Sequence, residues 1–181
     1  MAGRFEGAQM NKFFQTLSVL VSAGFLFLGF NNPALSRPVS SAVDKATIKE
    51  MVVREARNMG VSASLALAVA HAESSFHSNA ESRKGARGVM QIMPATAVGE
   101  YGIRPQLLWN PRVNIRLGLH YLERLIRKFN GRTDLALSFY NGGSAVGPPQ
   151  RARIIPATYP YIRKVRHLQT FYQTRLYKGR L

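Results

Sequence analysis

The apolar positions from residue 47 onward recur every three or four residues, which is the period of an α-helix. A first helix is predicted over residues 47–59, because Thr47 and Glu50 have the spacing of a capping box and Gly60 follows as a stop signal. Its apolar face carries Ile48, Met51, Val52, Ala56 and Met59. This pattern predicts an amphipathic helix that packs against the rest of the domain.

Residues 62–73 predict a helix that is apolar on almost every side, with Ser62 in position to cap its first turn. Such a helix is expected in the centre of the domain. Ala66, Val69 and Ala70 lie three or four positions before Glu73, so the turn preceding this carboxyl group is apolar. Poor solvation raises the pKa of a carboxyl group, which makes Glu73 a candidate general acid at neutral pH.

Residues 75–84 are polar and, with Gly85 and Gly88, predict an ordered loop that returns to the end of the buried helix. Val89 and Ile92 in the apolar stretch that follows are assigned to the core. Pro94 then starts a short helix.

Asn110 and Pro111 mark the start of a longer helix that ends near residue 130. Its apolar positions are Val113, Leu117, Tyr121, Leu125 and Phe129. The other face is mostly basic and is interpreted as solvated, with one favourable pair between Glu123 and Arg127. No chemistry is assigned to that face.

A short helix over residues 134–139 is predicted to present Tyr140 and Asn141 at a turn formed by Gly142 and Gly143. A final helix is predicted near the C-terminal end of the chain and is interpreted as a packing helix. Its apolar face carries Tyr161, Val165, Leu168, Tyr172 and Leu176.

The composition limits the classes of function. A chain of 181 residues with 46% hydrophobic residues suits one domain with an adequate core. The absence of cysteine excludes disulfides, thiolate zinc sites and a cysteine nucleophile. The four histidines form no metal-ligand pattern and no nucleotide-binding glycine motif occurs, so neither a metal nor another cofactor is predicted.

The net charge is +16, from 25 basic and 9 acidic residues, which indicates an anionic partner or environment. The basic residues are spread along the chain and match no zinc finger, basic zipper or RNA-binding signature. No nucleic acid is therefore expected as a partner, although nucleic-acid binding remains a minor alternative. A basic surface suited to an anionic cell envelope requires fewer assumptions.

The N-terminal segment predicts export. Arg4 and Lys12 precede an uncharged apolar run over residues 13–30, and small residues that a signal peptidase could read follow at 34–36. We predict a signal peptide over residues 1–36, with cleavage after residue 42 as the alternative, and a mature domain over 37–181 in the periplasm or cell envelope. An uncleaved membrane anchor and a start at Met10 stay open.

A series of ordered motifs spans the chain from about residue 62 to residue 165. These are Glu73-Ser74-Ser75-Phe76, Asn79-Ala80, Gly85-Ala86-Arg87-Gly88-Val89-Met90-Gln91-Ile92-Met93-Pro94, Asn110-Pro111, Asn114-Ile115-Arg116-Leu117-Gly118, Tyr121-Leu122 and Phe139-Tyr140-Asn141-Gly142-Gly143. Together they resemble the soluble lytic transglycosylase domain, a family of peptidoglycan-cleaving enzymes in the lysozyme-like superfamily.

The resemblance implies a mainly α, lysozyme-like helical domain with at most a minimal β element. It also implies a glycan cleft between the loop over 74–94 and the turn at 140–141, with Glu73 as the catalytic residue. Substrate-binding roles fall by resemblance on Ser82, Gln91, Met93, Tyr140 and Asn141. The usual family pattern has a small residue in place of Phe139 and alanine in place of Gly142, so the local shape of the cleft is expected to differ.

The implied reaction cleaves the β-1,4 bond between N-acetylmuramic acid and N-acetylglucosamine in peptidoglycan glycan strands. Glu73 would act as general acid and then as base, giving a 1,6-anhydromuramoyl product. Ordinary glycosidases need two carboxylates, whereas Glu81 and Glu100 match no catalytic position of the family. A lysozyme-type hydrolase of the same fold and a non-enzymatic basic binding protein remain alternatives.

The expected partners follow from this reaction. Peptidoglycan glycan strands are the predicted substrate, and a monomer is expected. A small domain is also compatible with recruitment by a secretion, conjugation or flagellar assembly, which the sequence leaves open.

Overall fold

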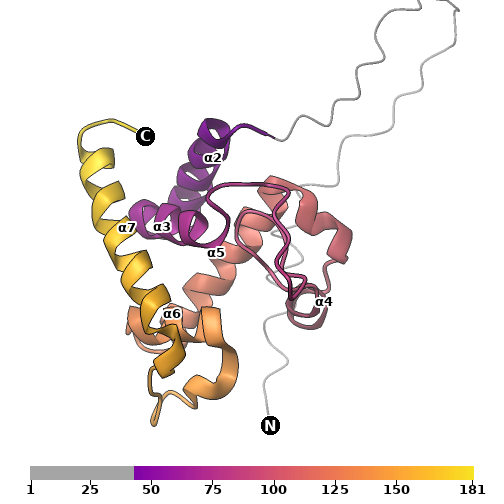
Figure 1. Cartoon of the computed structure of the whole chain (residues 1–181), viewed down its shortest axis with the longest axis vertical. Coiled ribbons are helices and arrows are strands. Elements are labelled where there is room, and N and C mark those ends of the chain that lie inside the picture. Colours follow the sequence, from indigo (N-terminus) through magenta and orange to yellow (C-terminus); the bar gives the residue numbers. More distant parts are fainter. Residues whose placement is uncertain (1–42) are drawn as a thin grey trace, which may run out of the picture. The chain divides into compact units, whose positions relative to one another are not determined.

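The computed structural model describes residues 43–181 (Figure 1). The predicted signal peptide, its alternative cleavage sites and the possible start at Met10 lie outside the described residues. Within the described part of the chain, no helix is long and apolar enough to cross a membrane.

Residues 43–181 form a helical domain. Its α-helices are α2 (Lys45–Asn58), α3 (Ala63–Ser74), α4 (Pro94–Tyr101), α5 (Pro111–Lys128), α6 (Thr133–Gly142) and α7 (Tyr159–Tyr177), and its short 3-10 helices are η1 (Pro105–Trp109), η2 (Gly143–Val146) and η3 (Pro156–Thr158). No strand occurs in this range, where two isolated bridges join Glu81 to Arg87 and Arg87 to Ile92. The predicted mainly α fold with a minimal β element is confirmed.

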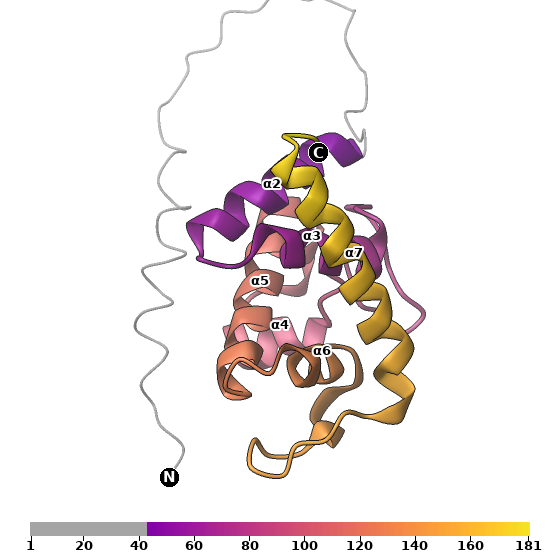
Figure 2. The ribbon, with the colours of Figure 1, turned by 90° about the vertical axis from the view of Figure 1, so that its left-hand side faces the viewer.

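Helix α3 lies in the centre of the domain, with α2 and α7 packed against it (Figure 2). The Ser62 hydroxyl caps this helix by accepting a hydrogen bond from the Leu65 amide at 3.4 Å. Every residue from Ser64 to Ala70 is buried. The predicted cap and central position of this helix are confirmed, and α7 lies alongside the turn that carries Glu73.

The start of α2 corrects the predicted capping box. Asp44 is the N-cap residue, and its carboxylate accepts hydrogen bonds from the amides of Ala46 and Thr47 at 2.8 and 3.1 Å. The Thr47 hydroxyl donates to the same carboxylate at 2.6 Å. A carboxylate satisfies two free amides and lies at the positive end of the helix dipole, so Asp44 caps the helix in preference to Thr47.

Helix α5 begins as predicted. The Asn110 side-chain oxygen accepts a hydrogen bond from the Val113 amide at 3.2 Å, and Pro111 occupies the first helical position. The predicted pair between Glu123 and Arg127 also forms, at 2.8 Å. These local signals act within one turn of helix, which is why the sequence reveals them.

Part of the basic face of α5 pairs with carboxylates of other helices, which the predicted solvated face did not include. Arg112 and Arg116 lie 3.6 and 3.8 Å from the carboxylate of Glu55, a buried residue of α2. Arg124 pairs with Glu100 of α4. A buried carboxylate needs neighbouring cations, so Arg112 and Arg116 join α5 to Glu55 of α2. The exposed pair with Glu100 joins α5 to α4.

Helix α6 extends further than predicted. It continues to Gly142, so Tyr140 and Asn141 lie in its last turn and not in a turn after it. A Cβ atom at Gly142 would lie 2.7 Å from the side chain of Ile155 and 2.8 Å from that of Thr158. Close packing of the following segment therefore accounts for glycine at this position.

Candidate active site

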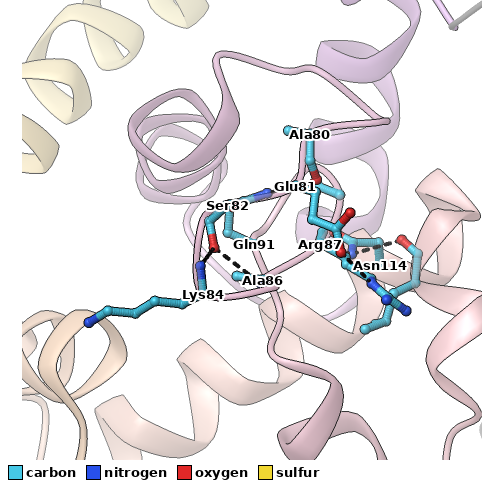
Figure 3. A network of polar contacts seen from close by, with 10 residues as sticks. Ala80, Glu81, Ser82, Lys84, Ala86, Arg87, Gln91 and Asn114 are labelled. Carbon is cyan, nitrogen blue, oxygen red and sulfur yellow. Dashed lines mark hydrogen bonds and ion pairs between the residues drawn. The ribbon is translucent and has the colours of Figure 1, made fainter.

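Asn114, a fully buried residue of α5, organises the loop between α3 and α4. Its side-chain oxygen accepts a hydrogen bond from the Met90 amide at 2.8 Å, and its nitrogen donates to the carbonyls of Arg87 and Leu108 at 2.8 and 3.0 Å. Figure 3 shows Asn114 reaching the loop beside Arg87. Gly88, with φ +74°, fits here because a Cβ atom would lie 2.4 Å from the Asn114 nitrogen. One side chain thus holds three backbone groups and fixes the path of the loop.

Gln91 also holds the loop by its side chain. Its backbone is left-handed, with φ 48°, and its side-chain nitrogen donates to the carbonyls of Ala80 and Gly88 at 3.1 and 2.9 Å. A left-handed conformation is uncommon for a residue other than glycine, and these two hydrogen bonds help to stabilise it. The amide group therefore points into the loop (Figure 3).

Ser82 caps a tight turn within the same loop. Its hydroxyl oxygen accepts hydrogen bonds from the amides of Lys84 and Ala86, at 3.3 and 3.0 Å (Figure 3). A loop serine commonly stabilises a turn in this way. The structure therefore gives Ser82 a local role in the backbone of the loop.

Glu73 occupies the last turn of α3, where its side chain is only partly exposed. The Tyr161 hydroxyl of α7 donates a hydrogen bond of 2.6 Å to the Glu73 carboxylate. Burial raises the pKa of Glu73 to about 7, against the smaller lowering effects of the Tyr161 hydrogen bond and the Lys164 charge. The carboxyl group can therefore exchange a proton near neutral pH.

Two tyrosine hydroxyls lie near this carboxyl group. Tyr140 donates a hydrogen bond of 2.9 Å to the carbonyl of Met90, and Tyr161 donates to Glu73 as described. Burial, followed by the charge of Glu73, raises the pKa of both tyrosines well above the ordinary value. Both hydroxyls therefore remain protonated at neutral pH and act as hydrogen-bond donors.

A cavity of about 230 Å³ lies beside Tyr140. Its lining residues are Gln91, Ile92, Met93, Thr96, Tyr121, Phe139, Tyr140, Asn141 and Gly143. The loop and the end of α6 thus bring together four of the predicted substrate-binding residues, namely Gln91, Met93, Tyr140 and Asn141. Ser82 and Glu73 are not among the lining residues. Tyr140 does line the cavity, and the charge of Glu73 contributes to raising the pKa of Tyr140.

Comparison with known proteins places this arrangement in a family. The model of the transglycosylase SLT domain matches residues 50–150, which include Glu73, the loop, and all nine residues that line the cavity. The chain belongs to the transglycosylase SLT domain family. Its helical domain is accordingly of the lysozyme-like type, as the sequence predicted.

Relatives of this SLT-domain chain differ widely in length. The soluble lytic murein transglycosylase of Salmonella typhimurium is 34% identical over 102 residues, which are 52% of this chain and 16% of that protein. The membrane-bound lytic murein transglycosylase E of Buchnera aphidicola is 28% identical over 156 residues, covering 72% of this chain and 71% of that protein. The chain therefore spans a minor part of the first relative and most of the second.

A solved structure shares both sequence and fold with this SLT domain. It is an inactive glutamate-to-glutamine mutant of the lytic transglycosylase Slt from Pseudomonas aeruginosa, with 33% identity and a TM-score of 0.62. The match covers 71% of this chain and 24% of that one.

Tyr161 is the site residue that sequence reasoning missed. Its position in the apolar repeat of α7 predicted a packing role, yet its hydroxyl contacts Glu73 across 88 positions of the chain. Periodicity places an aromatic residue on the inward face of a helix but does not reveal the polar partner of its hydroxyl group. The available signal was a tyrosine, rather than a phenylalanine, on the apolar face of the helix, because its hydroxyl group needs a polar partner there.

Proposed function

We propose that this SLT-domain chain is a peptidoglycan lytic transglycosylase. It would cleave the β-1,4 bond between N-acetylmuramic acid and N-acetylglucosamine in glycan strands. The observation that carries this proposal is the Glu73 carboxyl group, whose pKa of about 7 lets it both donate and accept a proton near neutral pH. Two relatives are named lytic murein transglycosylases, which supports the same assignment.

In the first step, protonated Glu73 donates its proton to the glycosidic oxygen while the bond from that oxygen to the anomeric carbon breaks. The leaving sugar departs with a new hydroxyl group, and Glu73 is left as a carboxylate. General acid catalysis is most effective when the pKa of the acid lies near the working pH. With a pKa of about 7, about half of the Glu73 groups carry the required proton at neutral pH.

In the second step, the Glu73 carboxylate accepts the proton of the 6-hydroxyl group of the muramoyl residue. The oxygen of that hydroxyl group attacks the anomeric carbon and closes a 1,6-anhydro ring. The proton balance closes, because Glu73 regains the proton that it gave away. No external water enters the reaction.

The hydroxyl group of Tyr161 is placed to stabilise the Glu73 carboxylate between the two steps. Its hydroxyl group already donates a hydrogen bond to Glu73 at 2.6 Å. A hydrogen bond to a charged group is stronger than one to a neutral group, so this contact stabilises the carboxylate formed after the first step. Tyr161 would therefore position Glu73 and limit how far burial raises its pKa.

A single carboxyl group is consistent with the surroundings of Glu73. Burial, Tyr161 and Lys164 account for the shift of its pKa, and no second carboxylate contributes. Glu81 is exposed and pairs with Arg87 at 3.1 Å. Ordinary glycosidases require two carboxyl groups about 5–9.5 Å apart, so the transglycosylase route fits these residues better than hydrolysis does.

The related structure of Slt from Pseudomonas aeruginosa gives independent support. Replacing a glutamate by glutamine produced an inactive form of that protein. One glutamate carboxyl group is therefore needed for activity in a relative that shares 33% sequence identity with this chain.

Peptidoglycan as a substrate requires export, which we include in the proposal. The apolar run over residues 13–30 supports a signal peptide over residues 1–36. N-terminal sequencing of protein from the cell envelope should find a start near Arg37. Protein that retains Met1 or Met10 and remains in the cytoplasm would contradict export.

The activity is tested by incubating the full chain with purified sacculi. Soluble muropeptides should be released in proportion to enzyme and time. Binding to sacculi without any release would contradict an enzymatic function and favour a basic binding protein.

A further inference from the structure

An exposed ammonium group lies over one wall of the cavity. The Lys128 nitrogen is 4.4 Å from the ring centroid of Phe139, which lines the cavity, and 5.7 Å from that of Phe129. The two rings lie 5.9 Å apart. The faces of aromatic rings attract cations, so this pair of rings holds the ammonium group near the cavity.

The spacing along α5 places Lys128 on the same helix face as the cavity. Tyr121, Arg124 and Lys128 follow one another at intervals of three and four residues, which puts them on one face of a helix. Tyr121 lines the cavity, and the Arg124 guanidinium lies 5.4 Å from the centre of its ring. A line of rings and cations therefore extends from the cavity toward the C-terminal end of α5.

The cations of this part of α5 differ in their partners. Arg124 pairs with Glu100, and Arg127 pairs with Glu123 at 2.8 Å. Among residues 43–181, no carboxylate lies within ion-pair distance of Lys128. Lys128 is therefore a cation that is available to bind an anionic group of a ligand at the cavity.

Peptidoglycan supplies anionic groups at a suitable place. Its glycan backbone is neutral, but each muramoyl residue carries a lactyl arm that ends either in a carboxylate or in a peptide with carboxylates of its own. A strand bound at the cavity would extend these arms away from the sugar rings. A fixed ammonium group near the cavity would contact the anionic side arm and not the neutral glycan backbone.

We propose that Lys128, positioned by the Phe139 ring, binds a carboxylate on the side arm of the muramoyl residue. The enzyme would then prefer strands with free carboxylates over strands in which these groups are neutral. This inference rests on the proposed function, because it names the form of the substrate for the same site. The inference gives Lys128 a role in substrate binding, although the sequence analysis assigned no chemistry to the basic face of α5.

Phe139 is a positioning residue in this proposal. A small side chain at this position would provide no ring for the ammonium group. The Phe139 ring acts through Lys128, so its loss should weaken the preference for charged strands.

The test uses three soluble glycan fragments of equal length. The first carries peptides with free carboxylates, the second carries peptides whose carboxylates are converted to amides, and the third has lost its peptides and ends in lactyl carboxylates. Binding is measured by calorimetry at low salt, and kcat/KM is measured for cleavage. The third fragment separates recognition of the lactyl arm from recognition of the peptide.

Lys128→Met should weaken binding and lower kcat/KM for carboxylate-bearing fragments by up to about fivefold, the upper end of the range for an exposed ion pair. The amidated fragment should be unaffected, and Lys128→Arg should retain the preference. Lys178→Met is the matched control, because Lys178 is exposed, lies after α7 and does not line this cavity. Phe139→Leu should reduce the ratio between charged and amidated fragments, even if both are cleaved more slowly.

Equal effects of Lys128→Met on charged and amidated fragments would overturn the inference. The same is true if Lys178→Met gives an equal loss, since net charge alone would then explain the result. If the chain binds the fragments but cleaves none, the proposed function fails while the binding ratios still decide this inference. If it cleaves all fragments without any preference, only this inference fails.

Discussion

The hydroxyl group of Tyr161 donates a hydrogen bond of 2.6 Å to the carboxylate of Glu73 and thereby joins α7 to the end of α3. This bond opposes the effect of burial on the pKa of Glu73, which is about 7. Removing it should raise that pKa further, because a hydrogen bond to the carboxylate favours the ionised form.

Tyr161→Phe should therefore move the alkaline fall of kcat/KM to higher pH, because Glu73 would keep its proton to a higher pH. The rate at the optimum should also fall, since the carboxylate formed in the first step loses its donor. Tyr172→Phe is the matched control, because the Tyr172 hydroxyl contacts His71 at 2.8 Å and not Glu73. A pH profile that both variants leave unchanged would exclude a role of Tyr161 in setting the pKa.

Glu73→Gln should fold and yet lose nearly all release of muropeptides, because an amide cannot donate the required proton. General acid-base catalysis contributes about 10²–10⁴-fold, and a group that performs both transfers should lie toward the upper end. Glu81→Gln should retain most of the activity, since Glu81 is exposed and pairs with Arg87. Similar losses of muropeptide release in the two variants would contradict the assignment of Glu73 as the catalytic acid.

The same substitution should change the dependence of stability on pH. The pKa of Glu73 rises from 4.5 to about 7 on folding, so the native state holds this proton more tightly than the unfolded state. The free energy of unfolding should fall as pH rises from about 4.5 to 7, by at most about 3 kcal/mol for this group. Chemical denaturation at pH 4 and pH 8 should show a smaller fall in Glu73→Gln than in the unmutated chain.

Local signals in the sequence predicted most of the fold, whereas the contacts between distant segments were not predicted. Ser62 and Asn110 were recognised as caps, because a cap acts on amides two or three residues away. Asp44 was missed because the spacing of Thr47 and Glu50 has the form of a capping box, whereas the Thr47 hydroxyl in fact donates to the Asp44 carboxylate. The ion pairs of Glu55 depend on how α2 packs on α5, which the periodicity of neither helix determines.

In the candidate site, too, residues in local motifs were predicted and contacts between distant segments were not. The motifs identified the cavity residues Gln91, Met93, Tyr140 and Asn141, since these lie in short conspicuous stretches. The hydrogen bonds of Asn114 join segments 24 and 27 positions apart and were not predicted. Tyr161 lies still further from Glu73 along the chain. Side-chain periodicity reveals which face of a helix is buried but not which polar group it meets.

Two glycines of the loop provide a test of how it is held. Gly88 and Gly85 both have positive φ angles, but a Cβ atom at Gly88 would collide with Asn114 and the Leu108 carbonyl, whereas one at Gly85 would have nothing within 4 Å. Gly85→Ala should cost about 1–2 kcal/mol from backbone strain alone. Gly88→Ala should cost about 1–3 kcal/mol more, because the Asn114 contact must also shift.

Urea unfolding of both glycine variants measures these costs. Only Gly88→Ala should also reduce the cleavage of sacculi, since the Met90 amide and the Arg87 carbonyl depend on Asn114. Equal losses of stability and activity in the two variants would show that Asn114 does not organise the loop.

The central claim is that Glu73 directs the 6-hydroxyl group of the muramoyl residue, and not water, to the anomeric carbon. The most direct test is mass spectrometry of the muropeptides released from sacculi by the unmutated chain. The account predicts 1,6-anhydromuramoyl ends, which are lighter than hydrolysed reducing ends by one water. Reducing ends as the main product would contradict it and would indicate a lysozyme-type hydrolase with a second carboxylate still to be found.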